Sequence, residues 1–120
     1  MRVLVCGGRD FADHAAVCRA LAPYRPANVI RDVSDAIIIH GGAPGADTLA
    51  DEWCDTFGVR KRVFLADWQK HGKAAGPIRN QRMIDEGRPD LVVAFPGGRG
   101  TADMIRRARS AGIKVVEVRG

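Results

Sequence analysis

Residues 91–101, LVVAFPGGRGT, run from a short apolar segment through a glycine turn into a stretch with helical periodicity. The apolar segment 91–95 is typical of a strand buried on both faces of a parallel sheet. Three glycines in four positions let backbone amides approach a ligand, and unpaired N–H groups at a helix start attract anions. We therefore predict a phosphate site here, with Thr101 either donating its hydroxyl to the anion or capping the helix.

Two more segments repeat this arrangement. The apolar run 3–6 ends in GGRD (7–10), and the apolar run 36–39 is followed by HGGAPGAD (40–47). Because the carboxyl ends of parallel strands meet at one edge of a sheet, the three glycine turns are predicted to surround one ligand.

The remaining elements alternate in the same way. We expect helices at 13–21, 46–57, 78–86 and 101–110, further strands at 62–65 and 114–118, a polar connection at 25–35 and a long loop at 66–76. Five strands that alternate with four helices, without a hairpin signal, predict an α/β fold in which a parallel sheet lies between helices. A length of 120 residues fits one domain, residues 1–120.

Composition narrows the classes of partner. The formal charge of +5 favours anionic partners, either the phosphates of a small ligand or a nucleic acid. No apolar run approaches the roughly 20 residues that cross a bilayer, so we expect a cytoplasmic protein without a membrane partner. Cys6, Cys18 and Cys54 lack zinc-site spacing, so we expect reduced, mostly buried thiols and no metal site.

Charged and polar residues near the turns leave alternatives open. Arg9 suits a phosphate, while Asp10 either pairs with it or caps the next helix. Asp47 either bonds a ribose hydroxyl or favours its own helix terminus. His40 either contacts the ligand or is a hydrogen-bonded structural residue.

In the predicted sheet, the helix that starts near residue 78 begins at the same edge as the glycine turns. Arg79 and Asn80 either complete the polar face of the site or lie on a solvent-exposed helix start. Trp68, with basic neighbours, either stacks on a base as part of a lid or packs over the sheet edge. The predicted ligand-binding residues are Gly7, Gly8, Arg9, Gly41, Gly42, Gly45, Asp47, Arg79, Asn80, Pro96, Gly97, Gly98, Gly100 and Thr101.

Four motifs in order, CGGRDF (6–11), HGGAPGAD (40–47), GPIRNQRM (76–83) and FPGGRGT (95–101), resemble the YspA/YpsA-related branch of the SLOG superfamily. The resemblance implies a minimal Rossmann-like domain with sheet order 3-2-1-4-5 that senses or processes nucleotide-derived ligands. This order places the first and third glycine turns beside the crossover where such sheets bind ligands.

Two more distant resemblances imply different activities. The third turn resembles the motif of LOG-type phosphoribohydrolases, but Met104 stands where that motif has its catalytic glutamate, and Asp103 lies about 100° around the helix. The segments GAPGAD (42–47) and RNQR (79–82) resemble the DprA family, which binds single-stranded DNA. The LOG-type resemblance also implies a possible homodimer.

We therefore expect binding or sensing of a nucleotide or nucleotide-derived ligand, with no cofactor required and no catalytic residue assigned. One alternative is N-glycosidic cleavage of a nucleoside monophosphate, in which Asp47 or Asp103 replaces the absent glutamate. The other is DprA-like binding of single-stranded DNA.

Overall fold

The computed structural model describes residues 1–26 and 36–119 and contains the predicted parallel sheet. Its strands are β1 (Arg2–Cys6), β2 (Ile37–His40), β3 (Arg60–Val63), β4 (Leu91–Ala94) and β5 (Lys114–Glu117), in the order β3-β2-β1-β4-β5. All neighbouring strands are parallel, and β1 pairs with both β2 and β4. The predicted fold and sheet order are confirmed.

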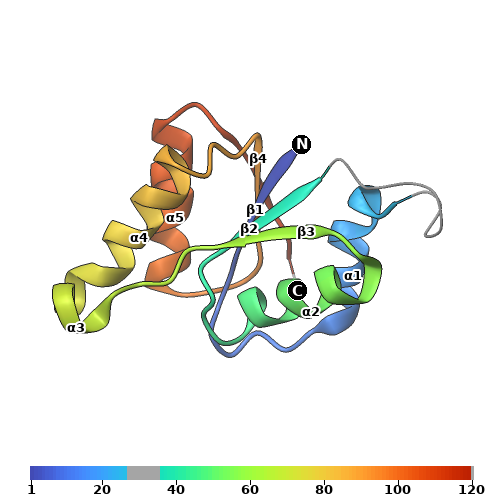
Figure 1. Cartoon of the computed structure of the whole chain (residues 1–120), viewed down its shortest axis with the longest axis horizontal. Helices are drawn as coiled ribbons and strands as arrows, with labels where there is room; N and C mark the ends of the chain where they lie inside the picture. The colour runs from blue at the N-terminus through green and yellow to red at the C-terminus, as the bar shows by residue number, and fades with distance from the viewer. Residues whose placement is uncertain (27–35, 120) are drawn as a thin grey trace.

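The four predicted helices are also present. They are α1 (His14–Leu21), α2 (Ala46–Phe57), α4 (Ala75–Asp85) and α5 (Arg99–Ser110). Figure 1 shows the sheet between two groups of helices, with α1 and α2 on one side and α4 and α5 on the other. No helix within residues 1–26 and 36–119 is long and apolar enough to cross a membrane.

Successive side chains of β1 point to opposite faces of the sheet, so each face has its own part of the hydrophobic core. Val3 and Val5 pack with residues of α1 and α2, whereas Leu4 and Cys6 pack with Met83 of α4 and Met104 of α5. This burial on both faces explains why the strands read as continuous apolar runs.

The prediction of a loop at 66–76 is wrong, because most of this segment is helical. It contains α3 (Trp68–His71) and the 3-10 helix η2 (Gly72–Ala74), and α4 already begins at Ala75. Asp67 caps α3 by accepting a hydrogen bond from the Lys70 N–H at 3.0 Å. Pro77 is tolerated in the first turn of α4, where an N–H has no intrahelical partner.

The third strand begins two residues earlier than the expected range 62–65. All of β3 is exposed, and its pairing with β2 alone defines it as an edge strand, on which Arg60 and Lys61 are tolerated. Phe64, just beyond the strand, packs in the core. The apolar pattern around this residue is the reason that the strand was expected at 62–65.

Two smaller differences concern the ends of elements. The short 3-10 helix η1 (Ala22–Tyr24) follows α1, and most of the expected connection 25–35 lies outside the described residues. Asp13, rather than Asp10, caps α1 by accepting a hydrogen bond from the Ala16 N–H at 3.0 Å. Asp13 directly precedes the first helical residue, so its carboxylate reaches the third N–H of the helix.

Candidate functional site

The three glycine turns lie in contact at the carboxyl ends of β1, β2 and β4. Turn 1 (residues 7–10) lies between turn 2 (residues 40–45) and turn 3 (residues 96–98). The Gly8 N–H donates to the Pro96 carbonyl at 2.9 Å, and the Gly8 carbonyl accepts from the Ala46 N–H at 3.2 Å. The predicted common edge is therefore present in the structure.

Close packing accounts for several of the glycines. A Cβ at Gly8 would lie 2.9 Å from the Pro96 carbonyl oxygen, and one at Gly97 would lie 2.2 Å from Thr101 Oγ1. Gly45 has a φ of +83°, and a Cβ there would lie 2.1 Å from the Gly8 oxygen. The turns approach one another this closely because they lack side chains.

The start of α5 is open where it leaves turn 3. A Cβ at Gly98 or Gly100 would meet nothing within 4 Å, and Gly98, the N-cap residue, supplies no side-chain hydrogen bond. The first turn of α5 also carries no acidic residue. The first N–H groups of this helix therefore have neither an intrahelical partner nor a side-chain acceptor in the described structure.

Thr101 does not cap α5, because the helix begins at Arg99. Its side chain is buried within the first turn and lies against Gly97. The capping alternative for Thr101 is therefore wrong.

Two exposed arginines belong to the segments that adjoin the open helix start. Arg9 in turn 1 and Arg99, the first residue of α5, are both exposed. Among the described residues, neither forms an ion pair. Arg99 was absent from the predicted set, although its position between Gly98 and Gly100 is a usable signal. Both guanidinium groups are available to an anionic ligand.

Backbone N–H groups of turn 2 have hydrogen-bond acceptors within the protein. The Asp47 carboxylate is buried, and its Oδ2 accepts hydrogen bonds from the Gly41 N–H at 3.1 Å and the Ala43 N–H at 3.2 Å. Burial raises the pKa of Asp47, and the opposing effects of these hydrogen bonds and of Arg79 are smaller. The side chain holds turn 2 closed.

His40 is likewise hydrogen-bonded inside the protein. Its Nδ1 accepts from the Gly42 N–H at 3.0 Å, so Nε2 carries the proton of the neutral ring and donates to Asp51 Oδ1 at 2.8 Å. Asp51 Oδ2 also accepts from Lys61 at 2.8 Å. The structure therefore agrees with the structural alternative for His40, which links β2, α2 and β3.

Arg79 and Asn80 connect turn 2 to α5. Arg79 Nη1 donates to the Gly41 carbonyl at 2.8 Å, and its Nε donates to Asn80 Oδ1 at 3.1 Å. Asn80 is buried and donates to the Gly100 carbonyl at 3.3 Å. Burial lowers the pKa of Arg79, and the nearby Asp47 opposes this effect. The exposed-helix-start alternative fails for both residues, since each is fixed by contacts distant in sequence.

The two carboxylates considered for catalysis, Asp47 and Asp103, accept hydrogen bonds from within the protein. Asp103 accepts hydrogen bonds from Arg106 at 2.6 Å, Arg107 at 2.8 Å and Asn80 at 3.0 Å. Met104 is fully buried in the core. Asp10 is the exposed carboxylate of turn 1 and has no hydrogen-bond or ion-pair partner among the described residues.

The three cysteines differ in burial. All three cysteines are free; Cys6 and Cys54 are buried, as expected, but Cys18 is exposed. Burial raises the pKa of Cys6 to about 12, which keeps its thiol protonated near neutral pH.

Trp68 is 54 % exposed on α3, so it does not pack over the sheet edge. No group of three or more potential metal ligands occurs within residues 1–26 and 36–119.

Comparison with known proteins gives two matches. The model of the "YspA, cpYpsA-related SLOG family" matches residues 1–71. The "Gene 61 protein" of Mycobacterium phage D29 is 40 % identical over 122 residues, which cover 96 % of this chain and 94 % of that protein. The packed glycine turns, the sheet order and these matches together show that the chain belongs to the YspA, cpYpsA-related SLOG family.

Proposed function

We propose that this protein binds a phosphate-bearing nucleotide or nucleotide derivative at the carboxyl edge of its sheet. The observation that carries the proposal is the open N-terminus of α5 beside the crossover between β1 and β4. Ligands of open α/β sheets bind at such crossovers, and helix N-termini bind phosphate. Membership of a SLOG family supports a nucleotide-related ligand.

The three turns have different roles in this proposal. Turn 3 and the first turn of α5 hold the phosphate through the N–H groups around Gly98 and Gly100, while Arg9 and Arg99 neutralise its charge. Turn 1 forms the opposite wall. The amides of Gly41, Gly42 and Ala43 are already hydrogen-bonded, so turn 2 and Asp47 shape the site rather than bind the phosphate.

We favour binding or sensing over cleavage of the ligand. N-glycosidic cleavage needs a carboxylate that stabilises the reacting sugar or activates water. Asp47 and Asp103 are both held in internal hydrogen bonds, and Met104 lies in the core. Asp10 is the remaining carboxylate in the described turns, and Asp10→Asn tests whether it takes part in cleavage.

A thermal-shift screen tests the proposal with nucleoside mono-, di- and triphosphates, dinucleotides and ADP-ribose. A ligand at 100 times its dissociation constant is expected to stabilise the fold by about 2.7 kcal/mol. Gly98→Asp is expected to fold, because a Cβ meets nothing there, and to lose the shift, because its carboxylate competes for the helix N-terminus. Ser110→Asp, at an exposed position at the opposite end of α5, adds the same charge about 18 Å along the helix axis and is expected to keep the shift.

Four results would contradict the proposed site or its role in binding and sensing. The phosphate site is wrong if no phosphate compound gives a shift, or if Gly98→Asp leaves the shift intact. Release of free base that disappears in Asp10→Asn would establish cleavage instead of sensing. Oligonucleotide binding that weakens steeply with salt, without mononucleotide binding, would favour the DNA alternative.

A further inference from the structure

A groove separate from the glycine turns lies between α1 and the β4–β5 side of the sheet. Its volume is about 310 Å³. Its lining includes Arg19 of α1, Leu91 and Val93 of the β4 segment, Val116 of β5 and Arg119 after it. None of the predicted ligand-binding residues is among them, so this is a second candidate surface.

The groove is an incompletely covered face of the sheet. Leu91 and Val93 belong to the buried core of this face, but Val116 on β5 is 39 % exposed. On the opposite face, α5 contacts both β4 and β5, and Val115 packs against that core. Parallel sheets normally have helices over both faces, and in the described part of the chain this groove marks where the α1 side of β4 and β5 is incompletely covered.

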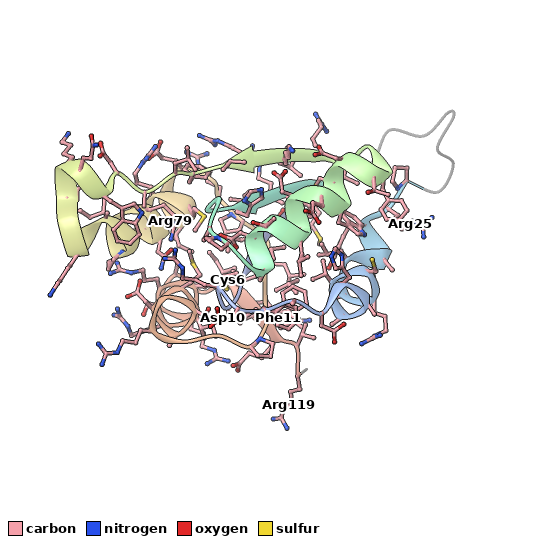
Figure 2. All side chains as sticks on the ribbon, turned by 90° about the horizontal axis from the view of Figure 1, so that it is seen from below. Cys6, Asp10, Phe11, Arg25, Arg79 and Arg119 are labelled. Carbon is pink, nitrogen blue, oxygen red and sulfur yellow. The ribbon has the colours of Figure 1, made fainter. Side chains whose placement is uncertain are left out.

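The charge around the groove has one sign. Among the described residues, Arg19 of α1 and Arg119 after β5 are the charged residues that line the groove, and no described Asp or Glu lines it. Within the described part of the chain, neither arginine forms an ion pair. Figure 2 shows the Arg119 side chain extending away from the ribbon. The rim therefore favours an acidic partner.

We propose that this groove binds an amphipathic helix of a partner protein, with an apolar stripe facing Val116 and Val93 and with acidic residues beside Arg19 and Arg119. A helix is the occupant that matches the layered geometry of the fold, and apolar stripes at helical spacing bind such grooves. A second copy of this groove is disfavoured, because an isologous contact would bring the same arginines together. This proposal does not depend on nucleotide binding.

The test uses two fluorescent, stapled helical peptides of about 15 residues, a length at which unaided helices are marginal. Both carry the same Leu stripe, flanked by Glu in one peptide and by Lys in the other. Fluorescence anisotropy is expected to show binding of the Glu peptide only. The double variant Arg19→Glu/Arg119→Glu is expected to weaken that binding by about tenfold or more and to gain binding of the Lys peptide.

Two single variants complete the design. Val116→Asp places a charge on the apolar wall at an exposed position and is expected to abolish binding while circular dichroism stays unchanged. Arg60→Glu lies on β3 at the other edge of the sheet and is expected to bind the Glu peptide like the parent protein.

Several outcomes overturn the proposal. One is equal binding of both peptides, or binding that the double variant leaves unchanged. Another is concentration-dependent self-association in sedimentation that Val116→Asp removes, which would make a second copy the occupant. Binding of decanoate without binding of either peptide would make the groove a small-molecule site.

Discussion

Gly97 and Gly98 are neighbours in turn 3 but meet opposite surroundings. A Cβ at Gly97 would lie 2.2 Å from Thr101 Oγ1 and 2.7 Å from the Gly8 nitrogen, while one at Gly98 would meet nothing within 4 Å. Gly97 therefore serves the packing of turn 1 against turn 3. Gly98 leaves the helix start free for a ligand.

Alanine substitutions separate these two roles. Gly97→Ala is expected to lower the free energy of unfolding by about 1–3 kcal/mol, because the turn and Thr101 must move apart. Gly98→Ala is expected to cost less than about 1 kcal/mol. Urea denaturation of both variants measures the difference. Equal losses would show that the contact between turns 1 and 3 is not what requires glycine at position 97.

Helices α2 and α5 both begin at a glycine without a side-chain cap, but their N-termini differ. The first N–H of α2, from Ala46, donates to the Gly8 carbonyl, and Asp47 turns back onto the amides of turn 2. At α5 no such acidic side chain is present. Of these two helix starts, only that of α5 remains open to an anion.

Asp47→Ala tests this account of turn 2. The change leaves the buried Gly41 N–H and the nearby Ala43 N–H without their acceptor, so the free energy of unfolding is expected to fall by about 1–3 kcal/mol. Amide hydrogen exchange at residues 41 and 43 is expected to accelerate. Glu52→Ala, on the exposed side of the same helix, is the control and is expected to change neither measurement. Unchanged exchange in Asp47→Ala would contradict the anchoring role.

The elements that the sequence predicted well are those whose local pattern and burial agree. The buried strands and the long helices appear within a few residues of their expected bounds. The exposed edge strand β3 was predicted two residues too late, because pairing with β2 rather than an apolar pattern defines it. The one-turn helix α3 was predicted as part of a loop, because it depends on a cap from Asp67. For the site, the common edge was predictable, but the internal partners of turn 2 were not.

Two carboxylates on opposite sides of the sheet, Asp51 and Asp103, stabilise the fold as a whole. Hydrogen bonding from Lys61, supported by His40, lowers the pKa of Asp51 in spite of partial burial. Burial alone would raise the pKa of Asp103, but hydrogen bonds from Arg107, Asn80 and Arg106 together lower it. Each group therefore binds its proton less readily in the folded protein than in the unfolded chain.

A carboxylate with a lowered folded-state pKa stabilises the protein above its unfolded-state pKa, and this stability is lost as the pH falls through the folded-state pKa. We expect the free energy of unfolding to fall below about pH 4, by about 1–3 kcal/mol from the two groups together. Asp47 acts in the opposite direction, because burial raises its pKa.

Urea denaturation between about pH 7 and about pH 3 measures this dependence. The double variant Asp51→Asn/Asp103→Asn is expected to be less stable at neutral pH and to give a flatter profile. Asp85→Asn, whose exposed carboxylate bonds to Gln81, is the control and is expected to follow the parent profile. A double variant that follows the parent profile would assign the acid sensitivity to other groups.

Local sequence pattern accounts for the alternation of strands and helices and for the single edge on which the three glycine turns emerge, because apolar periodicity and turn residues act over a few neighbouring positions. Which turn stays open is visible only in the folded protein. That depends on contacts such as Arg79 with Gly41, 38 residues apart in sequence, and Gly8 with Pro96. The groove beside β5 has the same origin, since local pattern defines a helix or a strand but not which part of a sheet the helices leave uncovered.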